Sequence, residues 1–323
     1  MADAIVVSRA EQERLLGFGD VLPIVNECYV ALARGEARLF PTLREPLDGG
    51  MLGVRGGEWP ARGLLGVKVS GFFLTNRAVG LDSHQAVVVL LDPKTGAPRG
   101  LVDGNHVTWV RTAIAGAAGT LALARPDARR VLVVGNGLQA EAQVRSHAWA
   151  LAERSPEFLV HAPREDGAKA REFCRRLEAH AIAVRPAADL REALAHVDVV
   201  VTATPSTEPV LRAADVRPGT HVTAMGADAP GKRELDQALL EAALVVPDDR
   251  NQCGRFGETQ WLDAARIERA PTIGEVLAGS ARGRAGNEIT VFDSTGLGLH
   301  DVAVAAEALT RAVAAGAGSA VEL

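Results

Sequence analysis

The segment that most constrains the fold is a short apolar strand followed at once by a glycine-rich turn and a helix. Residues 131–134 read Val-Leu-Val-Val, and Gly135-Asn136-Gly137-Leu138-Gln139-Ala140 comes next. In this pattern the first glycine permits a tight turn, the second lets a pyrophosphate approach the backbone, and the small residue lets helix and strand pack closely. Free N–H groups at the helix start complement phosphate charge. Because further strand–helix units follow, the motif predicts dinucleotide binding on a Rossmann fold rather than a glycine-rich turn without a ligand.

The chain has two textures. Residues 20–35 carry apolar side chains at helical spacing, and residues 38–112 contain short β-type runs with a turn signal at Asp92-Pro93-Lys94-Thr95-Gly96. From residue 131 to residue 292, strands rich in Val, Ile and Leu alternate with helices. Such alternation is typical of a parallel sheet covered on both faces. The expected fold class is therefore α/β, with a doubly wound parallel sheet and a second α+β domain.

Two domains are expected, because a chain of 323 residues usually holds more than one core. Residues 119–299 would form the Rossmann domain. Residues 1–118 and 300–323 would form the second domain, which is discontinuous because a last helix near residues 300–315 can return to the first lobe.

Composition argues against several classes of protein. The net charge is −5, acids and bases are interspersed, and no basic stripe or membrane-length apolar run occurs, so neither nucleic acid nor membrane is an expected partner. The first residues lack the regions of a signal peptide. Three cysteines without CxxC spacing indicate no disulfide framework and no metal site, which fits a cytoplasmic protein. Cys28 is expected in the core, and Cys253, in a polar stretch, is a candidate exposed thiol.

Two regions bear on the choice and contacts of the dinucleotide. After the expected strand at residues 158–161 no acid is placed to bind a ribose diol, and Arg164 could meet a 2′-phosphate, which favours NADP over NAD. The alternative is that Arg164 is a solvated residue at a helix start. Thr202-Ala203-Thr204 ends a later strand, where small polar residues could touch the nicotinamide ribose or simply lead out of the strand.

Three charged residues stand out as candidates for chemistry. Lys68 is one of only four lysines and lies in an apolar strand, and Arg111 lies near the start of an Ala-rich stretch, residues 109–124, that is expected to be helical. Both could bind a carboxylate, and Asp228 could move a proton at the ligand crevice. Each also has a structural reading, since a strand lysine usually points to water and a Gly-x-Asp loop is often a turn. The only tyrosine is Tyr29, so a Tyr-x-x-x-Lys dehydrogenase site is absent.

Taken together and in this order, the segments resemble the ornithine cyclodeaminase/mu-crystallin family. The most specific match is Gly226-Ala-Asp228-Ala-Pro230-Gly231-Lys232 with Glu234-Leu-Asp236, and the next are Arg111-Thr112-Ala113 and the glycine turn. The resemblance extends from the Arg44 region to residues 293–301. It implies a homodimer with a Rossmann domain and a second domain that supplies substrate contacts and the dimer interface.

The resemblance also implies roles for individual residues. Arg44, Lys68 and Arg111 would hold the α-carboxylate of the substrate, and Asp228, with Lys68, would form the catalytic pair. The expected cofactor contacts are Thr112, Gly135, Gly137, Leu138, Gln139, Arg164, Thr202, Ala203, Thr204, Met225, Gly226, Asp228 and His300.

Three functions follow from this resemblance. The leading one is an NAD(P)H-dependent imino acid reductase or amino acid dehydrogenase. The others are an ornithine cyclodeaminase-type lyase with bound NAD, and a crystallin-like protein that binds NADP and a small acid without turnover. This chain departs from the family with His300-Asp301 in place of a frequent Gln-Asp. If Arg55 faces the pocket, it would suit a dicarboxylate such as iminosuccinate; otherwise it is a solvated turn residue beside Gly56-Gly57.

Overall fold

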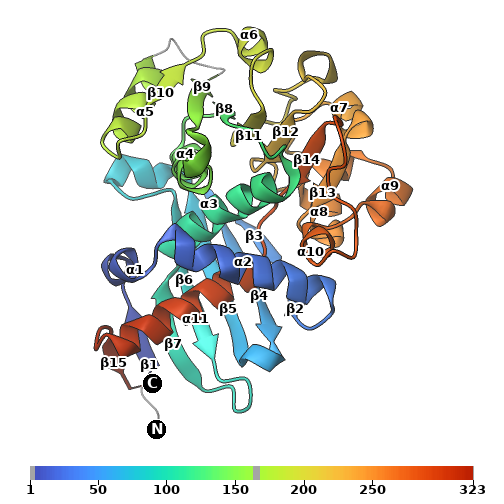
Figure 1. The fold of residues 1–323 in the computed structure, drawn as a ribbon. Coiled ribbons are helices and arrows are strands. Elements are labelled where there is room, and N and C mark those ends of the chain that lie inside the picture. The colour runs from blue at the N-terminus through green and yellow to red at the C-terminus, as the bar shows by residue number, and fades with distance from the viewer. Residues whose placement is uncertain (1–3, 163–167, 323) are drawn as a thin grey trace. The chain divides into compact units, whose positions relative to one another are not determined.

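The computed structural model describes residues 4–162 and 168–322, and it divides the chain into two compact units. Unit 1 comprises Met1–Arg111 and Leu297–Leu323, and unit 2 comprises Thr112–Gly296. Helix α3 (Gly104–Leu123) runs across the boundary between them. Arg164 lies outside the described residues. Figure 1 shows the ribbon, coloured along the chain.

Unit 1 is an α+β fold built on one mixed sheet, in the order β15-β1-β7-β6-β5-β4-β2, with β3 paired to β4. The Asp92 turn joins β6 to β7, and the Asp92 carboxylate accepts hydrogen bonds from the backbone N–H of Lys94 and Thr95. The strands are β1 (Ala4–Val7), β2 (Arg38–Leu39), β3 (Leu43–Leu47), β4 (Gly50–Trp59), β5 (Leu64–Phe73), β6 (His84–Leu91), β7 (Pro98–Asp103) and β15 (Ser319–Val321), and the helices other than α3 are α1 (Arg9–Leu15), α2 (Phe18–Ala33) and α11 (Gly298–Ala314).

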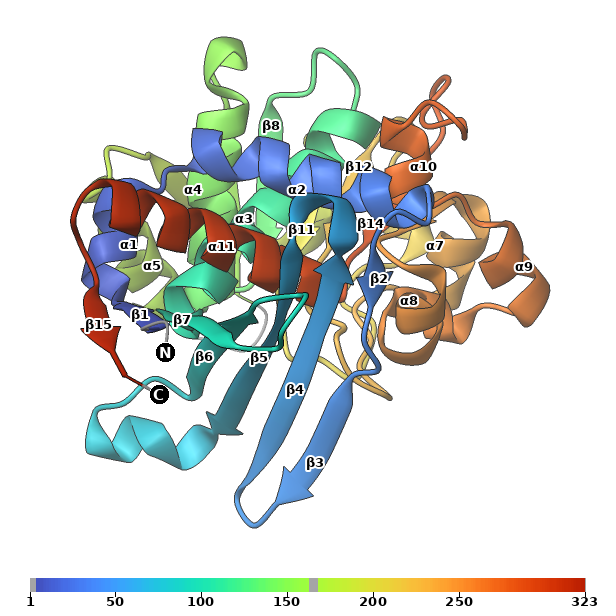
Figure 2. The ribbon, with the colours of Figure 1, turned by 90° about the horizontal axis from the view of Figure 1, so that it is seen from below.

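Glycines let helix α11 lie directly on this sheet. A Cβ atom at Gly298 would lie 2.5 Å from the backbone nitrogen of Gly56, and one at Gly57 would lie 3.4 Å from the side chain of Leu299. Helix α11 is apolar over most of its length and runs beside α2, as Figure 2 shows. The close approach fixes the first turn of α11, which contains His300 and Asp301, against β4 and β5.

Unit 2 is a doubly wound parallel sheet in the order β10-β9-β8-β11-β12-β14-β13. The chain passes from β8 outward to β10 and then returns to β11 on the other side of β8, which makes the β8/β11 boundary the switch point of the sheet. The strands are β8 (Arg130–Val134), β9 (Glu157–His161), β10 (Val184–Pro186), β11 (Val199–Thr202), β12 (His221–Ala224), β13 (Leu244–Pro247) and β14 (Thr290–Asp293). The helices are α4 (Leu138–Ala150), α5 (Ala168–Glu178), α6 (Leu190–Leu194), α7 (Gln237–Ala242), α8 (Arg250–Phe256), α9 (Ala264–Arg269) and α10 (Ile273–Leu277).

Both faces of the unit 2 sheet are buried, which explains its unbroken apolar strands. Leu132 and Val200 pack into one core cluster, and Val131 and Val199 pack into another. The predicted fold class, a doubly wound parallel sheet with a second α+β unit, is confirmed.

Two sequence-based expectations need correction. Helix α3 begins at Gly104 rather than near residue 109, because Asp103 caps its first turn by accepting a hydrogen bond from His106 N. The expectation of an exposed thiol at Cys253 is wrong. Cys253 lies in α8, is fully buried, and donates a hydrogen bond to Asp248 Oδ1 at 3.0 Å. Burial raises the pKa of this thiol, which favours its protonated form over the nucleophilic thiolate.

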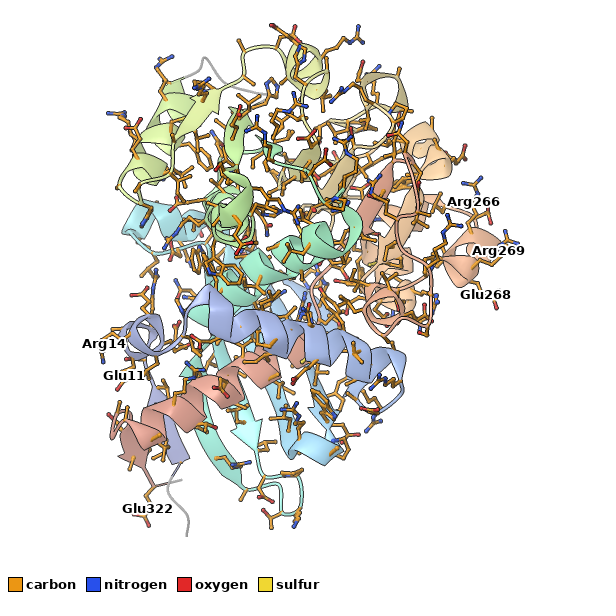
Figure 3. All side chains as sticks on the ribbon, in the orientation of Figure 1. Glu11, Arg14, Arg266, Glu268, Arg269 and Glu322 are labelled. Carbon is orange, nitrogen blue, oxygen red and sulfur yellow. The ribbon has the colours of Figure 1, made fainter. Side chains whose placement is uncertain are left out.

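Charged side chains are interspersed on the surface. In α9, Arg266, Glu268 and Arg269 project outward from the ribbon, as Figure 3 shows. Within residues 4–162 and 168–322, no single helix is long and apolar enough to cross a membrane; α1 and α2 meet the criteria of length and composition only together, and are bent by 94° where they join.

The glycine contact under α11 gives a test of the fold. Gly298→Ala should lower the free energy of unfolding by about 1–3 kcal/mol, because its new methyl group would overlap the β4 backbone. Gly254→Ala, also inside a helix (α8), is the control, since a Cβ atom there meets its nearest neighbour, the Ile267 side chain, at 3.4 Å. Denaturant unfolding of both variants checks this. Equal stability of Gly298→Ala and the parent chain would show that α11 does not lie this close to β4.

Candidate functional site

The candidate residues are distributed over both units. Unit 1 contains Arg44, Arg55, Lys68, Arg111 and His300, and unit 2 contains Asp228 and the remaining cofactor candidates.

Three side chains of unit 1 form a buried ionic cluster. Lys68 Nζ donates to Asp301 Oδ1 at 2.9 Å, and Arg111 Nε donates to the same oxygen at 3.0 Å. Lys68 Nζ also donates to Thr108 Oγ1 at 2.9 Å. The side chains of Lys68, Arg111 and Asp301 are at most 5% exposed. The structural reading of a strand lysine, that its side chain points to water, is therefore wrong for Lys68. A buried charge cluster of this kind is stable only when its charges are paired.

The cluster sets the protonation of its members. Burial lowers the pKa of Lys68 to about 7, and Arg111 and Arg55 act in the same direction while Asp301 opposes them. For Asp301, burial would raise the pKa, but Arg111, Lys68 and Arg55 outweigh it and hold the pKa well below the usual range. Lys68 is thus poised to gain or lose a proton near neutral pH.

Strand register places two more arginines on the same face of the sheet as Lys68. Arg55 on β4 lies directly opposite Lys68 on β5, and Arg44 on β3 lies opposite Gly53, two residues from Arg55. Directly opposed residues, and residues two apart in one strand, share a face. Arg55 is therefore a strand residue rather than a turn residue. Both arginines are half-buried.

Imidazoles near the cluster are neutral. Burial lowers the pKa of His300 to about 3, and Arg111 acts in the same direction. The His300 ring meets the Tyr29 ring edge-on at 4.5 Å. Burial likewise lowers the pKa of His84 to about 4, and the charges of Lys68 and Arg111 act in the same direction. Basic side chains thus gather at the Lys68 face of unit 1: Arg44 and Arg55 lie on it with Lys68, and Arg111 of α3 meets Lys68 through Asp301.

Unit 2 places the glycine turn at the carboxyl end of β8, beside the end of β11. Gly135 has φ +126°, and a Cβ atom there would lie 2.6 Å from the carbonyl oxygen of Ala203. A Cβ atom at Gly137 would have no neighbour within 4 Å, and Gly137 caps α4 without any side-chain hydrogen bond. Open space and N–H groups without a side-chain cap at a helix start fit the pyrophosphate of a dinucleotide. Leu138, which is 61% exposed, and half-buried Gln139 begin the helix.

The other cofactor candidates occupy three positions in unit 2. Thr112 lies in α3, and its carbonyl oxygen accepts a hydrogen bond from Gln143. Met225 N donates to Thr202 O at 2.9 Å, which ties the ends of β11 and β12 together. Thr202 and Thr204 both donate to Glu234, so their hydroxyl groups already have an acceptor within the protein.

Asp228 lies in the loop after β12, and its side chain is partly exposed. Its Oδ1 accepts a hydrogen bond from Lys232 Nζ at 2.6 Å, and Lys232 Nζ also donates to Gly226 O at 3.3 Å. The loop thus holds the carboxylate and a cation together, a pairing that the sequence run 226–232 contains but that its spacing alone does not reveal.

Sequence reasoning missed Asp301 and Glu234 as site residues. Asp301 lies in an apolar stretch, Leu299 to Ala305, and a buried acid there requires a cationic partner. That signal, together with the rarity of strand lysines, could have paired Asp301 with Lys68. Within residues 4–162 and 168–322, no cluster of three or more His, Cys, Asp or Glu side chains could hold a metal ion.

Known proteins resemble this chain over almost its whole length. An iminosuccinate reductase of Paracoccus denitrificans is 33% identical over 327 residues, which cover 99% of this chain and 100% of that protein. An alanine dehydrogenase of Archaeoglobus fulgidus is 34% identical over 326 residues, covering 98% of each chain.

Solved structures match over nearly the whole chain. An archaeal alanine dehydrogenase dimer with bound NAD superposes with a TM-score of 0.91 at 31% identity and covers 99% of both chains. The iminosuccinate reductase of Paracoccus denitrificans in complex with NAD⁺ also gives 0.91 at 31% identity, covering 99% of this chain and 100% of that chain. Residues 3–315 match the sequence model of the ornithine cyclodeaminase/mu-crystallin family, and the chain therefore belongs to that family.

Proposed function

We propose that this chain is an NAD(P)H-dependent oxidoreductase that reduces the C=N bond of an α-imino acid to an amino acid. The observation that carries the proposal is the buried cluster of Lys68, Arg111 and Asp301, with Arg55 and Arg44 on the same sheet face. Basic side chains gather on this face, which suits an anionic substrate. The relatives include an iminosuccinate reductase and a ketimine reductase.

The residues of unit 1 would hold the substrate carboxylate. Lys68 and Arg111 already share Asp301 Oδ1, so their positions are fixed before a ligand arrives. A preorganised cationic site does not need to reorder its side chains when it binds an anion. Arg55 would add a second contact for a distal carboxylate and would repel the distal ammonium of ornithine, which favours an iminosuccinate-type substrate over a cyclodeaminase reaction.

The residues of unit 2 would hold the dinucleotide and move a proton. The Gly135–Gly137 turn and the start of α4 would bind the pyrophosphate, and the bound nicotinamide supplies the hydride. Asp228 would exchange a proton with the substrate nitrogen, with Lys232 holding its carboxylate in place. Strand β9 ends at His161, and neither His161 nor Ala162, the last residue described there, is an acid that could bind a ribose diol, which favours NADPH over NADH.

We also propose a homodimer formed through the sheet of unit 1. Leu43, Val54, Val69 and Val87 form one apolar row across β3, β4, β5 and β6, on the face opposite Lys68. Leu43 is 49% exposed and Val87 is 37% exposed. A valine-rich sheet face of this kind is suited to a second copy of the chain.

Three free cysteines fit a reducing, cytoplasmic location.

The activity is tested by following oxidation of NADH or NADPH with ammonium or methylamine and a panel of keto acids. We expect oxidation that requires both the amine and the keto acid, with oxaloacetate preferred over pyruvate if Arg55 contacts the substrate. Asp228→Asn should lower kcat by roughly 10²-fold or more while cofactor binding is kept. Ammonia release from ornithine without net change in the cofactor would instead identify a cyclodeaminase, and no turnover with any acid would indicate a binding protein.

Protonation of Lys68 predicts how acid binding depends on pH. A protonated Lys68 attracts an anion, so affinity is full below a pH of about 7 and falls as Lys68 loses its proton above it. Succinate, a dicarboxylate without an imine to reduce, serves as the test ligand. Its inhibition constant should therefore rise above pH 7 and level off beyond the pKa of Lys68 in the complex. Lys68→Met should bind succinate more weakly and without this rise. An unchanged pH profile in Lys68→Met would contradict the assignment.

The dimer is tested by light scattering on the purified chain, which has a mass of 33.9 kDa per copy. We expect the parent chain at twice that mass and Val87→Glu as a monomer, because a buried carboxylate in the row would have no partner. Val313→Glu, on the exposed side of α11, is the matched control and should stay dimeric. A monomeric parent chain, or a dimeric Val87→Glu, would exclude this interface.

A further inference from the structure

Glu234 is a fully buried carboxylate that joins the ends of two strands in unit 2. Its Oε1 accepts hydrogen bonds from the backbone N and the Oγ1 of Thr204, both at 2.7 Å. Its Oε2 accepts from Thr202 Oγ1 at 2.7 Å and from Gly226 N at 2.8 Å. Four donors therefore meet one carboxylate, and they come from the end of β11 and the end of β12.

Neighbouring groups are arranged around this carboxylate. A Cβ atom at Gly226 would lie 2.5 Å from the Glu234 carboxyl group, so residue 226 must be glycine for the approach to occur. The backbone of Glu234 is held by a second buried carboxylate, because Glu258 Oε1 accepts from Glu234 N at 2.7 Å. Burial raises the pKa of Glu234, and its hydrogen-bond donors act in the opposite direction.

The strand ends that Glu234 joins lie at the switch point of the sheet. Thr202 on β11 pairs with Val134 on β8, directly before the glycine turn. The stretch from Gly226 to Asp228 follows β12, the next strand along. In doubly wound sheets, ligands bind outside the carboxyl ends of the strands at this point. Glu234 thus lies on the β11 and β12 side of the switch point, away from β9 and β10. It is fully buried there.

We infer that Glu234 is a positioning residue for the nicotinamide half of the dinucleotide. It fixes the Thr202–Thr204 end and the Gly226–Asp228 loop at one separation, so that these backbones meet the nicotinamide and its ribose in a set geometry. The pyrophosphate site at Gly135–Gly137 and α4 makes no hydrogen bond to Glu234 within the described part of unit 2. The inference rests on the proposed dinucleotide binding and assigns a distinct role within it.

Glu234→Gln is the informative variant because it preserves shape but cannot preserve all of the hydrogen bonds. Each carboxylate oxygen accepts one backbone N–H, from Thr204 or from Gly226. A backbone N–H cannot turn away as a hydroxyl group can. Whichever way the new amide is oriented, its NH₂ group faces a backbone donor, and one strand end must move.

The test compares two ligands, NADH and ADP-ribose, the second of which lacks nicotinamide. We expect Glu234→Gln to weaken NADH binding by roughly tenfold, measured by fluorescence titration. Binding of ADP-ribose, measured by calorimetry, should change by less than about threefold. Unchanged NADH binding in folded Glu234→Gln would overturn the inference, and so would an equal loss of both ligands.

Asp198→Asn is the matched control. Asp198 is also a buried carboxylate, it precedes β11 at the amino end of the strand, and it accepts hydrogen bonds from Arg129 N and Arg130 N. This variant should lower the melting temperature and leave the NADH:ADP-ribose affinity ratio unchanged. If Glu234→Gln does not fold, Thr202→Val is the second variant, because it removes one donor to Glu234. It should weaken the binding of NADH and leave the binding of ADP-ribose unchanged. NADH binding as tight as that of the parent chain would overturn the inference.

The same titration separates the inference from the proposed function. Failure of the parent chain to bind NADH or NADPH would contradict dinucleotide binding itself. Tight binding by the parent chain with an unaltered Glu234→Gln variant would contradict only the role of Glu234.

Discussion

The buried contact between Asp301 and the two cations Lys68 and Arg111 is the interaction on which the account of unit 1 depends. Three charges have been removed from water, and they remain stable because each has an opposite charge within 3.0 Å. This requires three elements to meet, β5, α3 and α11, although Asp301 is 233 residues from Lys68 in the chain. The return of α11 to the sheet is therefore a condition for the charged site, and the glycines at positions 56, 57 and 298 make that return sterically possible.

Unit 2 also contains buried carboxylates, and these accept hydrogen bonds from backbone N–H groups. Glu234, Glu258 and Asp293 are each fully buried, and they accept such hydrogen bonds from the segments after β11, β12 and α8, respectively. Loops at this edge have no ladder partners, so their N–H groups need acceptors. Burial, with Asp293 and Glu234 adding to it, raises the pKa of Glu258 to about 9, and burial raises the pKa of Asp293 to about 7. The crevice edge is thereby held by side chains that a ligand never needs to touch.

Much of the fold could be predicted because its signals are local. Alternation of apolar strands and helices after residue 131 identified the parallel sheet, and Asp92 to Gly96 identified the turn between β6 and β7. The site was less accessible to such reasoning. Residue type and resemblance point to Lys68 and Arg111 but not to Asp301, because its pairing spans most of the chain. The polar residues around Cys253 predict an exposed thiol wrongly, because some of them, such as Asp248, are themselves buried and accept hydrogen bonds.

Transfer of a hydride to the α-carbon of an imino acid is tested most directly by isotope transfer. The enzyme would be given cofactor deuterated at nicotinamide C4, in the position that is transferred, with ammonium and a keto acid. We expect an amino acid product that carries one deuterium at its α-carbon, detected by mass spectrometry and proton NMR. An amino acid product without deuterium at that carbon, formed from cofactor labelled on either face, would contradict the claim.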